Sequence, residues 1–83
     1  MIDSVTKQRI TVEVDSEHGL VVRLSDWEDK DYLEDILTEK YDVEYDYYKP
    51  EKDASGNDVA FTLYFGNKIE RALLQKIIDG VGD

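Results

Sequence analysis

The side chains of this chain that could do chemistry are mostly carboxylates, and most of them lie in one stretch, residues 26–58. This stretch holds thirteen Asp and Glu residues but only four lysines, so it carries −9 of the chain's net charge of −10. It also holds six of the nine aromatic residues. Disordered acidic tails are usually poor in aromatic residues. The stretch is therefore predicted to fold and to present an acidic surface.

Catalysis is one use for clustered carboxylates, but the sequence does not favour it. A glycosidase needs two acids that face each other across a substrate pocket, and a two-layer domain of 83 residues offers little room for a pocket of about 300 Å³. His18 is the only histidine and lies in a predicted tight turn, with no serine at a spacing typical of a nucleophile and its base. We expect no enzymatic activity and no catalytic residue.

Metal binding is a second use, and Asp53, Ser55, Asn57 and Asp58 superficially resemble a calcium loop. An EF-hand loop requires glycine at its sixth position and glutamate at its twelfth. Counted from Asp53, these positions hold Asp58 and Tyr64, so the segment is predicted to be a plain hairpin loop. The chain has no cysteine, which excludes thiolate ligands and disulfides. We expect no metal and no cofactor.

Apolar alternation predicts a β-hairpin at the start of the chain, with strands over residues 9–15 and 20–25. The turn between them contains Gly19, which can adopt a positive φ. The side chains predicted to face the core are Ile10, Val12, Val14, Leu20, Val22 and Leu24.

An amphipathic helix is predicted after this hairpin, because the apolar residues then recur with a helical period. Ser25 and Glu28 match a capping box at its start. Its predicted core residues are Leu33, Ile36 and Leu37, and its opposite face carries Asp31, Glu34, Asp35, Thr38 and Asp42.

The second half of the chain repeats the order of strand, strand and helix. Residues 43–49 alternate, with Val43, Tyr45 and Tyr47 predicted inward and Glu44, Asp46 and Tyr48 outward. The next strand is predicted to bury Val59, Phe61, Leu63 and Phe65. A last helix, from about residue 68 to residue 79, is predicted to bury Ile69, Ala72, Leu73 and Ile77.

These elements predict a single acidic α+β domain over residues 1–83, in the order β-β-α-β-β-α. The simplest packing is two layers, a four-stranded and mainly antiparallel sheet with both helices on one face. The order of the strands stays open. No apolar run approaches the roughly 20 residues of a membrane span, and a pI of 4.4 disfavours direct binding of nucleic acid or an anionic membrane. We expect a cytoplasmic protein, in the host cell if a phage encodes it.

Two acidic rows are predicted to merge into one partner-binding site. One lies on the helix and the other on the strand that follows, and alternate residues of a strand are about 6.7 Å apart. That distance is comparable to the spacing of phosphates along a nucleic acid, and Tyr48 would stack as a base does. The predicted site residues are Asp31, Glu34, Asp35, Asp42, Glu44, Asp46 and Tyr48. The alternative is a solvated face that only keeps the protein soluble.

In size, charge and mixed α/β character, the chain resembles the small phage-borne inhibitors that imitate DNA. These include uracil-DNA glycosylase inhibitors, anti-restriction proteins and many anti-CRISPR proteins. The resemblance implies an inhibitor that blocks the basic DNA- or RNA-binding site of a host defence or repair enzyme, such as a CRISPR effector, a nuclease or a glycosylase.

Two other interpretations stay open. The chain is alternatively an acidic adaptor or immunity-type domain that binds a basic protein without nucleic-acid mimicry. It is otherwise a structural component that self-associates through its sheet edges. A monomer and a dimer are both compatible with the sequence.

Overall fold

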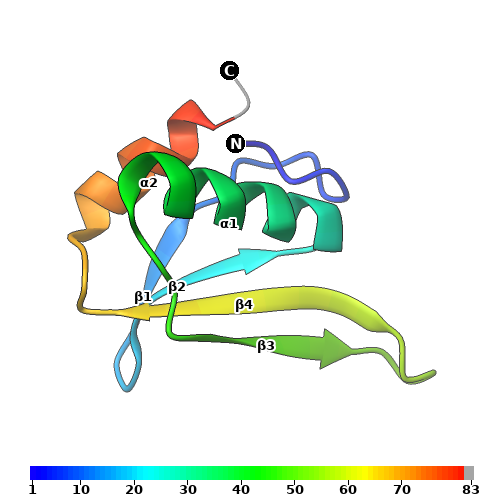
Figure 1. The fold of residues 1–83 in the computed structure, drawn as a ribbon. Helices are drawn as coiled ribbons and strands as arrows, with labels where there is room; N and C mark the ends of the chain where they lie inside the picture. The colour runs from blue at the N-terminus through cyan, green and yellow to red at the C-terminus, as the bar shows by residue number, and fades with distance from the viewer. Residues whose placement is uncertain (82–83) are drawn as a thin grey trace.

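The predicted order of elements, β-β-α-β-β-α, is confirmed in the computed structural model, which describes residues 1–81 (Figure 1). The elements are β1 (Val12–Asp15), β2 (Gly19–Leu24), α1 (Trp27–Tyr41), β3 (Tyr47–Lys52), β4 (Asp58–Gly66) and α2 (Arg71–Gly80). The turn between β1 and β2 places Gly19 at a φ of 78°, as its position in the turn predicts.

The four strands form one antiparallel sheet in the order β1-β2-β4-β3. The two hairpins are joined by the pairing of β2 with β4, in which Val22 lies opposite Leu63. Both helices lie on the same face of the sheet (Figure 1). The predicted two-layer α+β fold is therefore confirmed, and no helix or strand of residues 1–81 covers the other face of the sheet.

The core lies between the sheet and the two helices. Its largest fully buried side chains are Phe65, Leu24, Leu33, Leu37, Leu63, Leu74, Ile78, Val12 and Val22. Two strand residues predicted to be buried are exposed instead, Val14 at 60% and Val59 at 44%. Each lies close to the turn of its hairpin.

The predicted strand over residues 43–49 is wrong in its start, because β3 begins only at Tyr47. Val43 and Tyr45 pack against the core, and Glu44 and Asp46 are exposed, as predicted. The Asp46 N–H donates to the Tyr64 carbonyl at 2.7 Å, and Tyr47 then pairs with Tyr64 on the uncovered face, where their rings stack at 4.5 Å. Tyr48 pairs with Leu63 and points toward α1. Tyr47 and Tyr48 therefore lie on the faces opposite to those predicted.

The helix ends also differ from the prediction. The predicted capping box is absent, because the Ser25 N–H donates to Asp3 Oδ2 at 2.9 Å and Asp26 is the N-cap residue. The second helix begins at Arg71 rather than near residue 68. Its buried residues are Leu74, Ile77 and Ile78, whereas Ala72 and Leu73 are exposed and Ile69 is half-buried. The buried residues follow the spacing i, i+3, i+4 of a helix face.

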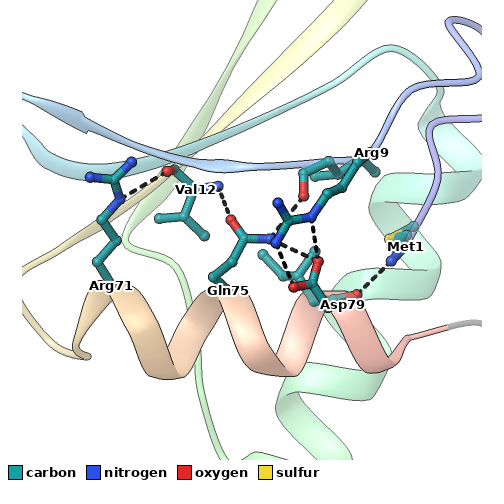
Figure 2. A network of polar contacts seen from close by, with 8 residues as sticks. Met1, Arg9, Val12, Arg71, Gln75 and Asp79 are labelled. Atoms are coloured by element: carbon teal, nitrogen blue, oxygen red, sulfur yellow. Dashed lines mark hydrogen bonds and ion pairs between the residues drawn. The ribbon is translucent and has the colours of Figure 1, made fainter.

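The free edge of β1 is closed by side chains of α2 (Figure 2). Gln75 Oε1 accepts the Val12 N–H at 2.7 Å, and Gln75 Nε2 donates to the Ile10 carbonyl at 3.1 Å. Arg71 Nε donates to the Val12 carbonyl at 3.2 Å. The Gln75 amide thus bonds β1 as a neighbouring strand would, which protects an edge that could otherwise pair with another chain.

Asp79 connects this network to the start of the chain. Its carboxylate accepts two hydrogen bonds from Arg9, at 2.9 and 2.7 Å, and one from Gln75 at 3.0 Å. The bonds from Arg9 are the largest influence on the Asp79 carboxyl and lower its pKa from 3.8 to about 2. The terminal amine of Met1 donates to the Ile78 carbonyl at 2.8 Å, so the first residues are fixed to α2 (Figure 2).

We predict that Gln75→Ala lowers the free energy of unfolding by about 1–3 kcal/mol, because the half-buried Val12 N–H loses its acceptor. Urea unfolding followed by circular dichroism measures the change. Lys76→Ala is the control, since Lys76 is exposed on the same helix and its loss should change stability by no more than about 0.5 kcal/mol. Equal effects of the two substitutions would contradict a structural role for the Gln75 amide.

The stability contributed by Asp79 should depend on pH. Its pKa is lower in the folded chain, so the contribution is complete above the ordinary value of 3.8 and is lost as the pH falls toward about 2. The difference in stability between the wild type and Asp79→Asn should therefore be constant near neutral pH and shrink between about pH 4 and pH 2. Urea unfolding across this range tests it, and a pH-independent difference would refute it.

Candidate protein-binding site

The acids at the start of α1 have structural roles. Glu28 and Asp29 lie in its first turn, where the positive end of the helix dipole stabilises a carboxylate. Asp29 also accepts hydrogen bonds from the backbone N–H of Ser4 at 2.8 Å and from its hydroxyl at 2.7 Å. These residues help to build the fold and do not require a partner to explain them.

The acids at the other end of α1 have no such explanation. Four of them form what we call the acidic corner: Asp35, Glu39, Asp42 and Glu44, all exposed. Among residues 1–81, no Lys, Arg or His nitrogen lies within 4.0 Å of their carboxylates. Glu39 and Asp42 lie at the negative end of the α1 dipole, where each carboxylate costs about 0.3–1 kcal/mol. The acidic corner therefore lowers stability and is the best candidate for a binding surface.

The backbone at Asp42 adds to this cost. Asp42 follows α1 with a φ of 54° and a ψ of 40°, the left-handed conformation, and the Val43 N–H donates to the Leu37 carbonyl at 2.9 Å. Glycine is the usual residue at a left-handed position that ends a helix. An aspartate here places both a strained residue and a negative charge at the helix end.

A groove lies on both sides of Val43 and Glu44, in the segment that leaves α1. On one side is a cavity of about 260 Å³ that is also lined by Glu34, Leu37, Thr38 and Tyr45. On the other side is a cavity of about 550 Å³ that is also lined by Asp42, Lys68, Ile69 and Leu73. Glu44 lines both cavities, Glu34 lines the first and Asp42 the second, and the walls of both are about as polar as they are apolar.

Lys30 lies behind this groove in a cage of aromatic rings. Its ammonium is 4.4 Å from the ring centre of Trp27, 4.5 Å from that of Tyr48 and 5.5 Å from that of Tyr45. Nζ is 3.0 Å from Glu34 Oε2, and the side chain is only 5% exposed. Burial lowers the pKa of Lys30, but Tyr45 and Glu34 raise it, and the net pKa lies above the ordinary value. The ammonium therefore stays charged and fixes Glu34.

The predicted site residues are only partly brought together. Glu34, Asp42 and Glu44 meet at the groove, and Asp31 lies 3.8 Å from the Lys30 ammonium. The remaining three predicted site residues are Asp35, Asp46 and Tyr48.

Asp35 lies on the exposed face of α1 as predicted, but the predicted strand row does not exist. Asp46 is outside β3 and forms an ion pair with Lys68 at 2.6 Å. Tyr48 packs against Trp27 with ring centres 5.8 Å apart, and does not line up with Glu44 and Asp46. The regular spacing expected of a strand therefore does not apply to these carboxylates.

Three residues of the aromatic cage and the acidic corner were not among the predicted site residues: Lys30, Trp27 and Glu39. Lys30 precedes Leu33 and Leu37 by three and seven residues, so the helical period already placed it on the buried face. Trp27 is the first residue of α1, is 43% exposed and has its ring centre 5.1 Å from that of Phe61. It is both a packing residue and part of the cage wall.

Within residues 1–81, no three His, Cys, Asp or Glu side chains are grouped as a metal ion would require. None of the described helices has the length and apolarity needed to cross a membrane. Comparisons with protein-family models, with curated proteins and with solved structures gave no match. The argument for a function therefore rests on the chain's own residues.

Substitution of Asp42 should stabilise the protein. We predict that Asp42→Asn raises the free energy of unfolding by about 0.5 kcal/mol, because it removes a charge from the negative end of α1. Asp42→Gly should raise it by about 1 kcal/mol, because glycine also adopts the left-handed conformation without strain.

Urea unfolding at low and high salt measures both changes, and the gain of Asp42→Asn should shrink as salt screens the dipole. Asp35→Asn is the control, since it removes the same charge from the middle of the helix and should change stability less. A loss of stability in Asp42→Gly would mean that the Asp42 carboxylate has a structural role.

Proposed function

We propose that this protein is an inhibitor that binds the basic nucleic-acid-binding site of another protein and excludes DNA or RNA from it. The observation that carries the proposal is the acidic corner, four exposed carboxylates that make no ion pair among residues 1–81. Glu39 and Asp42 lie at the helix end where a carboxylate costs stability. Stability alone does not account for such an arrangement, and a partner that supplies the missing cations does.

Two features of the acidic surface indicate the class of partner: its negative charge, and the folded helix that holds its carboxylates in place. A folded surface that is predominantly acidic is complementary to a surface of lysines and arginines, and the most common such surfaces in cells bind phosphate backbones. The carboxylates on α1 are held by a helix whose buried side includes Leu33 and Leu37. Such preorganised charges lose little freedom on binding, unlike those of a disordered acidic tail.

In this proposal the carboxylates of the acidic corner pair with the lysines and arginines that otherwise hold phosphates. Because the same cations cannot serve both ligands, the inhibitor and the nucleic acid compete. The net charge of −10 also attracts a basic partner at long range, which raises the association rate at low salt. The protein acts by occupancy and has no catalytic step.

The test is a competition experiment with purified enzymes that differ in their nucleic-acid site. A suitable panel is a guide-loaded CRISPR effector, a restriction endonuclease and a uracil-DNA glycosylase. We expect the protein to bind at least one of them and to displace its labelled DNA in a mobility-shift assay, less strongly as salt rises. Binding that leaves DNA in place would overturn the mimicry and favour the adaptor or immunity-type function. Binding to none would overturn the proposal for these enzyme classes.

Charge reversal at the acidic corner should weaken inhibition while preserving the fold. We predict that Asp35→Lys and Glu44→Lys each reduce affinity for the inhibited enzyme about tenfold or more, because a lost charge pair near the centre of an interface costs about 2–5 kcal/mol. Their effect on stability should be no more than about 0.5 kcal/mol, because both side chains are exposed and unpaired among residues 1–81.

Glu13→Lys is the control, since Glu13 is exposed on β1, pairs with Val21 and makes no ion pair among residues 1–81. Equal losses at Glu13, Asp35 and Glu44 would show that attraction depends on net charge alone. Asp46→Lys and Asp79→Lys are less informative, because they also break ion pairs with Lys68 and Arg9.

A further inference from the structure

We infer that the cavity between α1 and Val43 takes one arginine side chain of the basic partner. The inference rests on the proposed function, since the acidic corner brings the partner, and it adds the point at which the partner is recognised. The cavity of about 260 Å³ is smaller than the roughly 300–1,000 Å³ typical of small-ligand pockets. It is of the size to hold a single side chain.

The walls of this cavity match the two parts of an arginine. Leu37, Val43 and Tyr45 provide apolar surface for the aliphatic stem, which long cationic side chains bury while their charged end stays polar. Glu34 and Glu44 line the same cavity, and carboxylates are the natural acceptors for a guanidinium. The cavity is lined by two carboxylates and, among residues 1–81, by no Lys, Arg or His side chain, so it would repel an anionic ligand.

Glu34 is already positioned for this contact. Its Oε2 accepts the hydrogen bond from Lys30 at 3.0 Å, while its Oε1 receives no hydrogen bond from residues 1–81. A carboxylate has about four acceptor sites on its two oxygens, so Oε1 can accept a second cation. Because Trp27, Tyr45 and Tyr48 surround Lys30, the ion pair that orients Glu34 is itself held in place.

Arginine fits this cavity better than lysine. A planar guanidinium donates along two edges and stacks on an aromatic ring, whereas an ammonium is a compact and strongly hydrated charge. Tyr45 supplies a ring in the cavity wall, and Glu34 and Glu44 supply acceptors on two elements, α1 and the segment after it. A diffuse acidic surface would not distinguish the two side chains, so this preference is the signature of the site.

The experiment is an NMR titration of the ¹⁵N-labelled full chain with two blocked peptides, Ala-Ala-Arg-Ala-Ala and Ala-Ala-Lys-Ala-Ala. Their charges are equal, so net attraction is matched. We expect the arginine peptide to shift the amides of residues 37, 38 and 43–45 most, and to bind about threefold or more tightly than the lysine peptide. Equal binding, shifts spread over all acidic residues, or no shifts with either peptide would each overturn the inference.

A variant that fills the cavity without changing its charge completes the test. Thr38 is exposed on the cavity wall, so Thr38→Tyr should fold normally and abolish the preference for the arginine peptide. Thr11→Tyr, at an exposed position just before β1, is the matched control and should keep it. Retention of the preference in Thr38→Tyr would overturn the assignment to this cavity.

Failure of the cavity and failure of the proposed function give different results. If the protein is an inhibitor of the proposed kind but the cavity does not bind arginine, the wild type still displaces DNA from its enzyme. Thr38→Tyr then displaces the DNA equally well. If the function is wrong, no enzyme loses its DNA, whatever the peptides show.

Discussion

The enclosure of Lys30 is the interaction on which the candidate site depends. Its ammonium joins three parts of the chain: Trp27 and Glu34 on α1, Tyr48 on β3, and Tyr45 in the segment between them. Cation–π contacts strengthen when the cation is removed from water, and this one is 5% exposed. One lysine therefore fixes the edge of the sheet, the segment after α1 and a carboxylate of the groove.

The distribution of charge explains how so acidic a chain folds. The carboxylates near the start of α1 are stabilised by its dipole, and several others pair with a single cation each, as Glu51 does with Arg23 at 2.7 Å and Asp58 with Lys52 at 2.6 Å. The four carboxylates of the acidic corner are exposed and without an ion pair among residues 1–81, as Glu13 is on β1, and they lie in water, where repulsion is weakest. The apolar core between the layers carries the fold.

Much of the fold could be predicted from local patterns. Alternation and helical period identify all six elements, because each buries one face against a common core. The strand order could not be predicted, because it depends on which hairpin edges meet. The error at Tyr47 and Tyr48 has a simple cause: a strand that starts where the chain bends at Asp46 exchanges the faces of every residue after it.

The candidate site was predicted less well than the fold. The acidic face of α1 follows from its sequence period, but the groove beside Val43 depends on the left-handed turn at Asp42. The burial of Lys30 was not predicted, because a lysine is rarely buried unless its charge is paired. Of its aromatic partners, Tyr45 was predicted to face inward, but Tyr48 was predicted on the opposite face of its strand.

The side chains that bond the edge of β1 restrict how this protein can associate with other proteins through its sheet. Gln75 bonds the edge of the sheet at Ile10 and Val12, and β3 carries Pro50 between Lys49 and Glu51. Both features disfavour the addition of a strand from a neighbouring molecule at the outer edges of the sheet. A protein partner of the kind proposed above would then be contacted by side chains on the helices and loops, whose identity can change while the backbone stays the same. The same scaffold can therefore acquire a different partner through a few surface substitutions, without a new fold and without a tendency to polymerise.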